Sequence, residues 1–126
     1  MGVPHIAQRS LVMTVIRTKA ALVANYRTQL AENISDGIDG LIIVFNNQRS
    51  DEVATNSTYH HNRIGFNKSD AKVLTQIAKD KLDGKDLNDI QVAEVSRRMP
   101  KYAWQIITNK ISSGQYVKQS GVYVKV

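Results

Sequence analysis

The sequence contains no cysteine, and only two of its 126 residues are proline. Without cysteine there can be no disulfide framework and no thiolate metal site, which is typical of proteins from a reducing cell interior. Long hydrophobic runs are also missing, because the longest, "GLIIVF", falls well short of the about 18 residues that a membrane span needs. We therefore expect a cytoplasmic protein.

The chain is long enough for one domain with its own core, and its hydrophobic content of 42% argues against wholesale disorder. The first twelve residues, "MGVPHIAQRSLV", show little periodicity, and Met13 opens a second plausible beginning. We expect residues 1–12 to be a disordered leader or a remnant of cloning, and residues 13–126 to form a single α+β domain.

Carboxylates are absent from the last quarter of the chain. Residues 1–94 hold eleven Lys or Arg and eleven Asp or Glu, whereas residues 95–126 hold six basic residues and no acid. The whole net charge of +6 therefore arises near the C-terminus, which favours a polyanionic partner there. Tyrosine and tryptophan lie among these cations, and rings beside lysines can stack on bases while the lysines neutralise phosphates.

The candidate nucleic-acid-binding residues are the basic and aromatic side chains of this segment: Arg97, Arg98, Lys101, Trp104, Lys110, Tyr116, Lys118, Tyr123 and Lys125. The cations would contact phosphates, and the two tyrosines and Trp104 would stack on bases. The alternative is structural, because Tyr102 and Trp104 can instead fill the core while the lysines only solvate a surface.

The first half of the chain predicts a helix followed by a small central sheet. Thr18 can cap a helix that ends near Asn33 and whose apolar stripe is Leu22, Val23, Tyr26 and Leu30. The run "SDGIDG" has the composition of a turn, and "LIIVF" (41–45) has that of a strand buried on both faces. A weak strand or a loop follows at 53–59, and "RIGF" (63–66) is another candidate strand.

Three consecutive helices are predicted after the sheet. Ser69 can cap the first, which Gly84 ends; Asp86 can cap the second, which ends at Pro100. Pro100 suits the first position of the third, and Gly114 lies beyond its end. The apolar positions expected to face the core are Leu74, Ile77, Ala78 and Leu82; Ile90, Val92, Val95 and Met99; and Ala103, Ile106, Ile107 and Ile111.

The last twelve residues predict a β-hairpin with two different faces. One face carries four valines, at 117, 122, 124 and 126, and the other carries Tyr116, Lys118, Tyr123 and Lys125. Because side chains alternate along a strand, this division requires a turn of even length, either 119–120 or 118–121. We expect the tyrosine face to be exposed, and the edge of the hairpin could form a homodimer by strand addition.

Candidate catalytic and DNA-reading motifs are weak. The adjacent His60 and His61 suggest a one-metal nuclease, but that site needs a further ligand, and His5 is the only other histidine. The helices around Gly84 resemble a helix-turn-helix, although the second helix carries three acids that a DNA groove would repel, at Asp86, Asp89 and Glu94. We expect no enzyme activity and no cofactor.

Residues 65–106 contain "GFN", an "L..IA" helix, a glycine-containing turn, "L...Q" and a "KY..QI" ending. With these features the segment resembles a helical segment of phage-encoded DNA-transaction proteins, where it accompanies helicase-like domains. The chain has no Walker loop, so the resemblance implies a phage origin and a DNA-processing context in replication or recombination, without ATPase activity.

We therefore expect a small phage-type protein of the host cytoplasm that binds nucleic acid without strong sequence preference, favouring single-stranded or junction DNA over RNA. A phage or host replication protein is a further expected partner. The first alternative is an inhibitor that docks on a host enzyme or defence protein through the acidic helix face. The second alternative is a metal-dependent nuclease.

Overall fold

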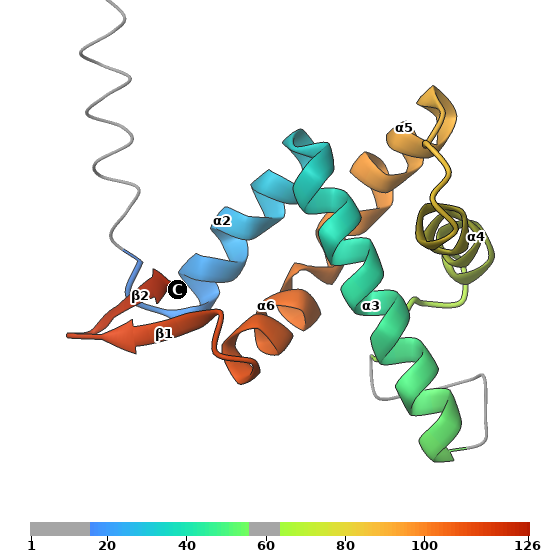
Figure 1. The fold of residues 1–126 in the computed structure, drawn as a ribbon. Coiled ribbons are helices and arrows are strands. Elements are labelled where there is room, and N and C mark those ends of the chain that lie inside the picture. The colour runs from blue at the N-terminus through green and yellow to red at the C-terminus, as the bar shows by residue number, and fades with distance from the viewer. Residues whose placement is uncertain (1–15, 56–63) are drawn as a thin grey trace, which may run out of the picture.

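The computed structural model describes residues 16–55 and 64–126, and the side chains of 51–55 are not described. The fold is α+β, as predicted: a helical body with one two-stranded antiparallel sheet near the C-terminus (Figure 1). The expected leader (1–12) and both adjacent histidines lie outside the described residues. The elements are α2 (Lys19–Glu32), α3 (Ile34–Thr55), α4 (Ala71–Leu82), α5 (Asp89–Arg98), the 3-10 helix η1 (Met99–Tyr102), α6 (Ala103–Ser112), β1 (Tyr116–Gln119) and β2 (Val122–Lys125).

Helix α2 begins and ends where its capping residues predict. The Thr18 hydroxyl accepts a hydrogen bond from the Ala21 N–H at 3.0 Å, and the Asn33 N–H donates to the Gln29 carbonyl at 2.8 Å. Its four predicted core residues are buried: Leu22, Val23, Tyr26 and Leu30. Asn33 also accepts from the Asp36 N–H at 3.3 Å, so the next helix starts without a linker.

The strand predicted at 41–45 is wrong, because residues 34–55 belong to the long helix α3, and most of the candidate strand at 53–59 lies outside the described residues. Leu41, Val44 and Phe45 are buried at helical spacing, and a short apolar run cannot be distinguished from a buried helix segment by periodicity alone. The glycines of "SDGIDG" form no turn. A Cβ on Gly40 would lie 2.7 Å from the Ile106 Cδ1, and one on Gly37 would lie 2.9 Å from the Val95 Cγ1. Glycine therefore allows α3 to approach α5 and α6 closely.

The candidate strand at 63–66 is also wrong in its described part, because residues 64–66 form no ladder. Side chains of the helices satisfy this backbone instead: Gly65 N–H donates to the Gln105 Oε1 at 2.9 Å, and Phe66 N–H donates to the Gln48 Oε1 at 3.2 Å. The segment thus contacts α3 and α6, bends at Gly65, which has a positive φ of 85°, and leads into α4.

Helices α4 and α5 exist as predicted, but their caps differ. The residue that directly precedes α4 is Asp70 and not Ser69. The Ser69 hydroxyl does not cap the helix and donates instead to the Asn67 side chain at 2.9 Å. Asn88, not Asp86, caps α5 through a reciprocal capping box with Gln91. Two expected core positions are exposed, Leu82 at 55% and Ile90 at 76%. Four of the other expected core positions on these helices are buried, at Leu74, Ile77, Ala78 and Val95, and Val92 is half-buried.

Pro100 marks a change of helix type. It lies in the 3-10 turn η1, which connects α5 directly to α6, so the second and third predicted helices are nearly continuous. Ala103, Ile106 and Ile107 of α6 are buried as expected, and Gly114 ends the helix with a positive φ of 82°.

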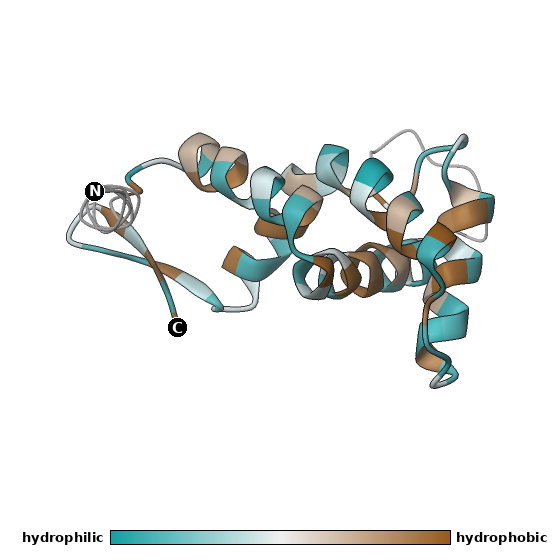
Figure 2. Cartoon of the chain, turned by 90° about the horizontal axis from the view of Figure 1, so that it is seen from above, coloured by the Kyte–Doolittle hydropathy of each residue, from teal (hydrophilic) through white to brown (hydrophobic). Residues whose placement is uncertain are grey.

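The core lies where α2 and α3 cross α6, and α4 packs on the far side of α3. Seen from above, the hairpin extends from one end of the helical body and α4 and α5 lie at the other (Figure 2). No described helix is both long enough and apolar enough to cross a membrane.

Candidate nucleic-acid interface

The hairpin has the predicted even-length turn at a shifted position. The turn residues are Ser120 and Gly121, with positive φ values of 53° and 78°, as a type I′ turn requires. Tyr116 pairs with Lys125, and Lys118 pairs with Tyr123. Compared with the predicted turn at 119–120, each β1 residue pairs with a β2 residue two positions further along the chain. Because side chains alternate with a period of two, the predicted separation into a valine face and a tyrosine–lysine face is retained.

The orientation of these two faces is opposite to the expectation. Tyr116 and Tyr123 are half-buried and pack against the core, whereas Val124 is 40% exposed and Val126 is 81% exposed. Burial, followed by the negative charge of Asp36, raises the pKa of Tyr116. Aromatic rings bury more apolar area than valine, so turning them inward stabilises the attachment of the hairpin to the helices.

Lys118 and Lys125 project from the rim of the tyrosine face and are exposed. Neither forms an ion pair within residues 16–55 and 64–126. The Lys118 Nζ lies 5.5 Å from the ring centroid of Tyr123, so this ring carries a cation over one face. These two lysines are the part of the predicted site that keeps free positive charge at the hairpin.

The Lys110 side chain is buried and paired within the fold. Its side chain is only 8% exposed, and its Nζ donates to the Asp39 carboxylate at 2.9 Å and to the Gln115 Oε1 at 3.4 Å. The same ammonium lies 5.6 Å from the ring centroid of Tyr26. Burial, with the charges of Asp39 and Asp36, raises the pKa of Tyr26, whose hydroxyl is the one buried side-chain polar atom without a partner in the described part of the chain. A phosphate cannot reach Lys110 without opening this cluster.

Lys101 and Arg98 converge on one buried carboxylate. Asp70 is 1% exposed, and it accepts from the Arg98 Nη1 at 2.7 Å, from the Lys101 Nζ at 2.8 Å and from the Tyr102 hydroxyl at 2.6 Å. Burial acts to raise the pKa of Asp70, but these hydrogen bonds outweigh it, so the pKa lies below its usual value. We call Asp70, Arg98, Lys101 and Tyr102 the Asp70 cluster.

Arg97 and Arg98 also pair with a carboxylate on their own helix. Arg98 Nε donates to Glu94 at 2.6 Å, and Arg97 binds the other oxygen of the same carboxylate. Glu94 lies one position before the acid-free segment, so a charge count that starts at residue 95 misses it. The apparent excess of charge at the end of α5 is thus neutralised locally.

Trp104 is exposed, as a stacking role requires. Its side chain is 52% exposed, and the Lys19 Nζ lies 4.3 Å from the centroid of its ring. Lys19 also donates to the Thr108 hydroxyl at 2.7 Å, so the ammonium is held by α6. The structural alternative for the aromatic residues therefore applies to Tyr102, which is buried, and not to Trp104.

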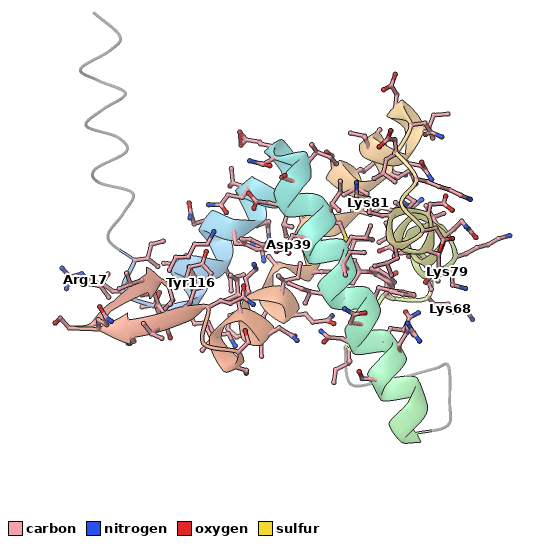
Figure 3. All side chains as sticks on the ribbon, in the orientation of Figure 1. Arg17, Asp39, Lys68, Lys79, Lys81 and Tyr116 are labelled. Atoms are coloured by element: carbon pink, nitrogen blue, oxygen red, sulfur yellow. The ribbon has the colours of Figure 1, made fainter. Side chains whose placement is uncertain are left out.

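Sequence reasoning missed the basic residues that begin the described chain. The Tyr123 N–H donates to the Ile16 carbonyl at 2.7 Å, which places Arg17 beside the outer edge of β2, as Figure 3 also shows. Three residues further on, Lys19 reaches Trp104. Three residues span at most about 11 Å, so the backbone of Lys19 lies at the same end of the molecule as the hairpin, and its side chain extends from there to the exposed ring. We call Arg17, Lys19, Trp104, Lys118 and Lys125 the hairpin surface. No local pattern predicts it, because its residues come from both ends of the sequence.

A second group of cations without an ion pair in the described residues lies on or beside α4, at the opposite end of the molecule (Figure 3). These are Lys68, Lys72, Lys79 and Lys81. They offer a matched control for charge changes at the hairpin. Residues 16–55 and 64–126 contain no group of three or more residues that could hold a metal ion, and the predicted nuclease histidines lie outside them.

Comparison with family models, curated proteins and solved structures finds no match for this chain. The resemblance of residues 65–106 to phage DNA-transaction proteins therefore stays a prediction, and the proposals below depend on the residues of the chain itself.

Proposed function

We propose that the protein binds single-stranded nucleic acid, without base specificity, at the hairpin surface. The observation that carries this proposal is the position of Lys118 and Lys125. Both are exposed on the same face of the hairpin, at diagonally opposite corners, and neither has a carboxylate partner in the described residues. Free cations beside an exposed tryptophan are the combination that single-strand binding uses, because the cations follow the backbone while a ring accepts a base.

The proposal assigns phosphate contacts to Arg17, Lys19, Lys118 and Lys125. It does not use Arg97, Arg98, Lys101 or Lys110, because each of these already binds a carboxylate. Breaking such a pair would leave a carboxylate close to the nucleic-acid backbone, which opposes binding. Four neutralised phosphates on a single strand predict a slope of about −3 for log K against log salt.

Base stacking is assigned to Trp104. Lys19 covers one face of the indole, so a base would stack on the other face or would displace the ammonium toward a phosphate. Each stacked base contributes about 1–3 kcal/mol in single-strand complexes. Tyr116 and Tyr123 lie at the same end of the molecule, but both are half-buried and pack against the core, so the proposal assigns them no stacked base.

The test is a titration of single- and double-stranded oligonucleotides at two salt concentrations, followed by anisotropy of the labelled oligonucleotide and by Trp104 fluorescence. The double variant Lys118→Glu/Lys125→Glu should lose at least about tenfold in affinity, because attraction becomes repulsion. The matched control Lys72→Glu/Lys79→Glu changes the net charge equally on α4 and should lose much less. Equal losses in both variants, or no binding by the unaltered protein, would contradict the proposal.

Docking on another protein is a second candidate function, and one observation favours it. Ile90 is 76% exposed at the start of α5, Leu82 is 55% exposed at the end of α4, and three carboxylates accompany them, at Asp83, Asp86 and Asp89. Apolar side chains with an acidic rim suit a partner that presents an apolar patch with a basic rim. In affinity capture from a bacterial lysate, a stoichiometric partner that Ile90→Ser loses and Lys118→Glu/Lys125→Glu retains would support docking.

A further inference from the structure

Strand β1 has an open edge, whereas the other edge of the hairpin is occupied. Gln119 and Val122 flank the two-residue turn and form the first hydrogen-bonded pair of the hairpin. Bonded and non-bonded pairs then alternate along the two strands, so Val117 and Val124 form the next bonded pair. Two bonds confirm this pattern: Val126 N–H donates to the Gln115 carbonyl at 2.8 Å, inside the hairpin, and Tyr123 N–H donates outward to Ile16 at 2.7 Å. Ile16 therefore covers the β2 edge.

On β1 the same pattern turns the backbone groups of Tyr116 and Lys118 outward, away from β2. No backbone or side-chain group in residues 16–55 and 64–126 binds these outward N–H and C=O groups. An edge of this kind is a template for another strand.

We infer that the β1 edges of two copies of this chain pair antiparallel about a twofold axis at Val117 and form a four-stranded sheet. In that register Tyr116 of one copy lies opposite Lys118 of the second copy, and Lys118 of the first copy lies opposite Tyr116 of the second. Both residues have outward backbone groups, so two bonded pairs form with four backbone hydrogen bonds. The edge is thus complementary to itself, as a twofold interface requires.

Side-chain chemistry selects this register over its neighbours. A twofold axis at Lys118 would place two ammonium groups directly opposite each other, which is destabilising. An axis at Tyr116 would place Lys118 opposite Gly114, which precedes the strand. The axis at Val117 instead places each lysine beside a tyrosine and places the two Val117 side chains in contact on the valine face, next to Val124 of each copy.

The contact is short, because β1 has only four residues. Its area lies below that of a stable interface, so the association should be weak and should depend on protein concentration. It would place the Lys118 and Lys125 side chains of both copies on one face of a single sheet. The inference does not depend on nucleic-acid binding, and its test contains no nucleic acid.

Single-cysteine variants test the register, since the natural chain contains no cysteine. Val117→Cys should form a disulfide dimer rapidly on mild oxidation, because residues of a non-bonded antiparallel pair lie about 4.5 Å apart between Cα atoms, within disulfide range. Gln119→Cys lies on the same face, but its two copies would be about 13 Å apart along the strands. Comparable rates for the two variants would overturn the register.

Proline at position 118 tests the hydrogen bonds. Lys118→Pro removes an outward N–H without removing a bond between β1 and β2, and Lys118→Ala removes the ammonium but keeps the N–H. In sedimentation equilibrium over a range of concentrations, the unaltered protein and Lys118→Ala should dimerise reversibly and Lys118→Pro should remain monomeric. A circular dichroism spectrum and thermal midpoint like those of Lys118→Ala would show that the proline variant is folded. Dimerisation of Lys118→Pro, or a monomer for the unaltered protein at every concentration, would overturn the inference.

Discussion

The Lys110 ammonium binds the Asp39 carboxylate at 2.9 Å, although the two residues lie 71 positions apart in the sequence. The pair is asymmetric, because the Lys110 side chain is 8% exposed and the Asp39 side chain is 55% exposed. Removing the carboxylate therefore leaves a buried cation, whereas removing the cation leaves a carboxylate that water can solvate.

Asp39→Ala should accordingly destabilise the fold more than Lys110→Met does. We expect Asp39→Ala to lower the free energy of unfolding by about 2 kcal/mol and Lys110→Met to change it by less than about 1 kcal/mol, because methionine fills the same apolar space. Urea denaturation of both variants measures the difference. Lys110→Met should also retain nucleic-acid affinity; a large loss of affinity would restore Lys110 as a phosphate contact.

The Asp70 cluster predicts a strong effect on stability. Asp70→Ala leaves Arg98, Lys101 and Tyr102 without their shared acceptor, and we expect a loss of about 3–5 kcal/mol, as for other broken buried ion pairs. Glu94→Ala is the control, because it also removes a carboxylate from Arg98 but from a more exposed position, and its loss should be smaller. Similar unfolding midpoints for the two variants would contradict the importance of burial.

Acid should destabilise the protein partly through the same carboxylate. The pKa of Asp70 is lowered in the folded state, so at pH values below about 3.9 the unfolded chain binds a proton before the folded chain does. The stabilisation is present above that pH and is lost as the pH falls toward the folded pKa. Asp80 and Glu94 also have lowered pKa values and add to the trend. Unfolding midpoints measured from about pH 5 to about pH 2 should fall less steeply in Asp70→Asn than in the unaltered protein.

Gly40 should not tolerate a side chain despite its position inside a helix. An added Cβ would lie 2.7 Å from Ile106 and 3.0 Å from Leu30, both of which are fully buried. Gly40→Ala should lower stability by about 1–3 kcal/mol through overpacking, and the higher helix propensity of alanine, worth about 1 kcal/mol, offsets only part of this loss. Asn46→Ala, at an exposed position of the same helix, should be neutral or slightly stabilising. Thermal unfolding would show whether the two variants differ.

The turn of the hairpin predicts a stabilising substitution. Ser120 has a positive φ of 53°, which asparagine adopts more readily than serine, so Ser120→Asn should raise the free energy of unfolding by up to about 1 kcal/mol. Gly121→Ala should lower it by about 1–2 kcal/mol, solely through its φ of 78°, since a Cβ there would have no atom within 4 Å. Opposite shifts of the thermal midpoint are expected, and a fall for Ser120→Asn would contradict the turn type.

Elements with local signals were predicted well. Helix α2 follows from the Thr18 cap and its apolar stripe, and α6 follows from Pro100 and Gly114. The two hairpin faces follow from strict alternation alone. The segment 35–55 was misread because its glycines resemble a turn, whereas in the fold they make room for Val95 and Ile106, residues that no local window contains.

The sequence by itself determined both ends of α2, the C-terminal end of α6 and the separation of valines from tyrosines and lysines, because capping, glycine and side-chain alternation act within a few residues. Only the tertiary structure decided which cations stay free. Arg98 and Lys101 meet Asp70, and Lys110 meets Asp39, across separations that local periodicity does not encode. It also decided that the tyrosines face inward, because burial of a hairpin face depends on which helix lies beneath it.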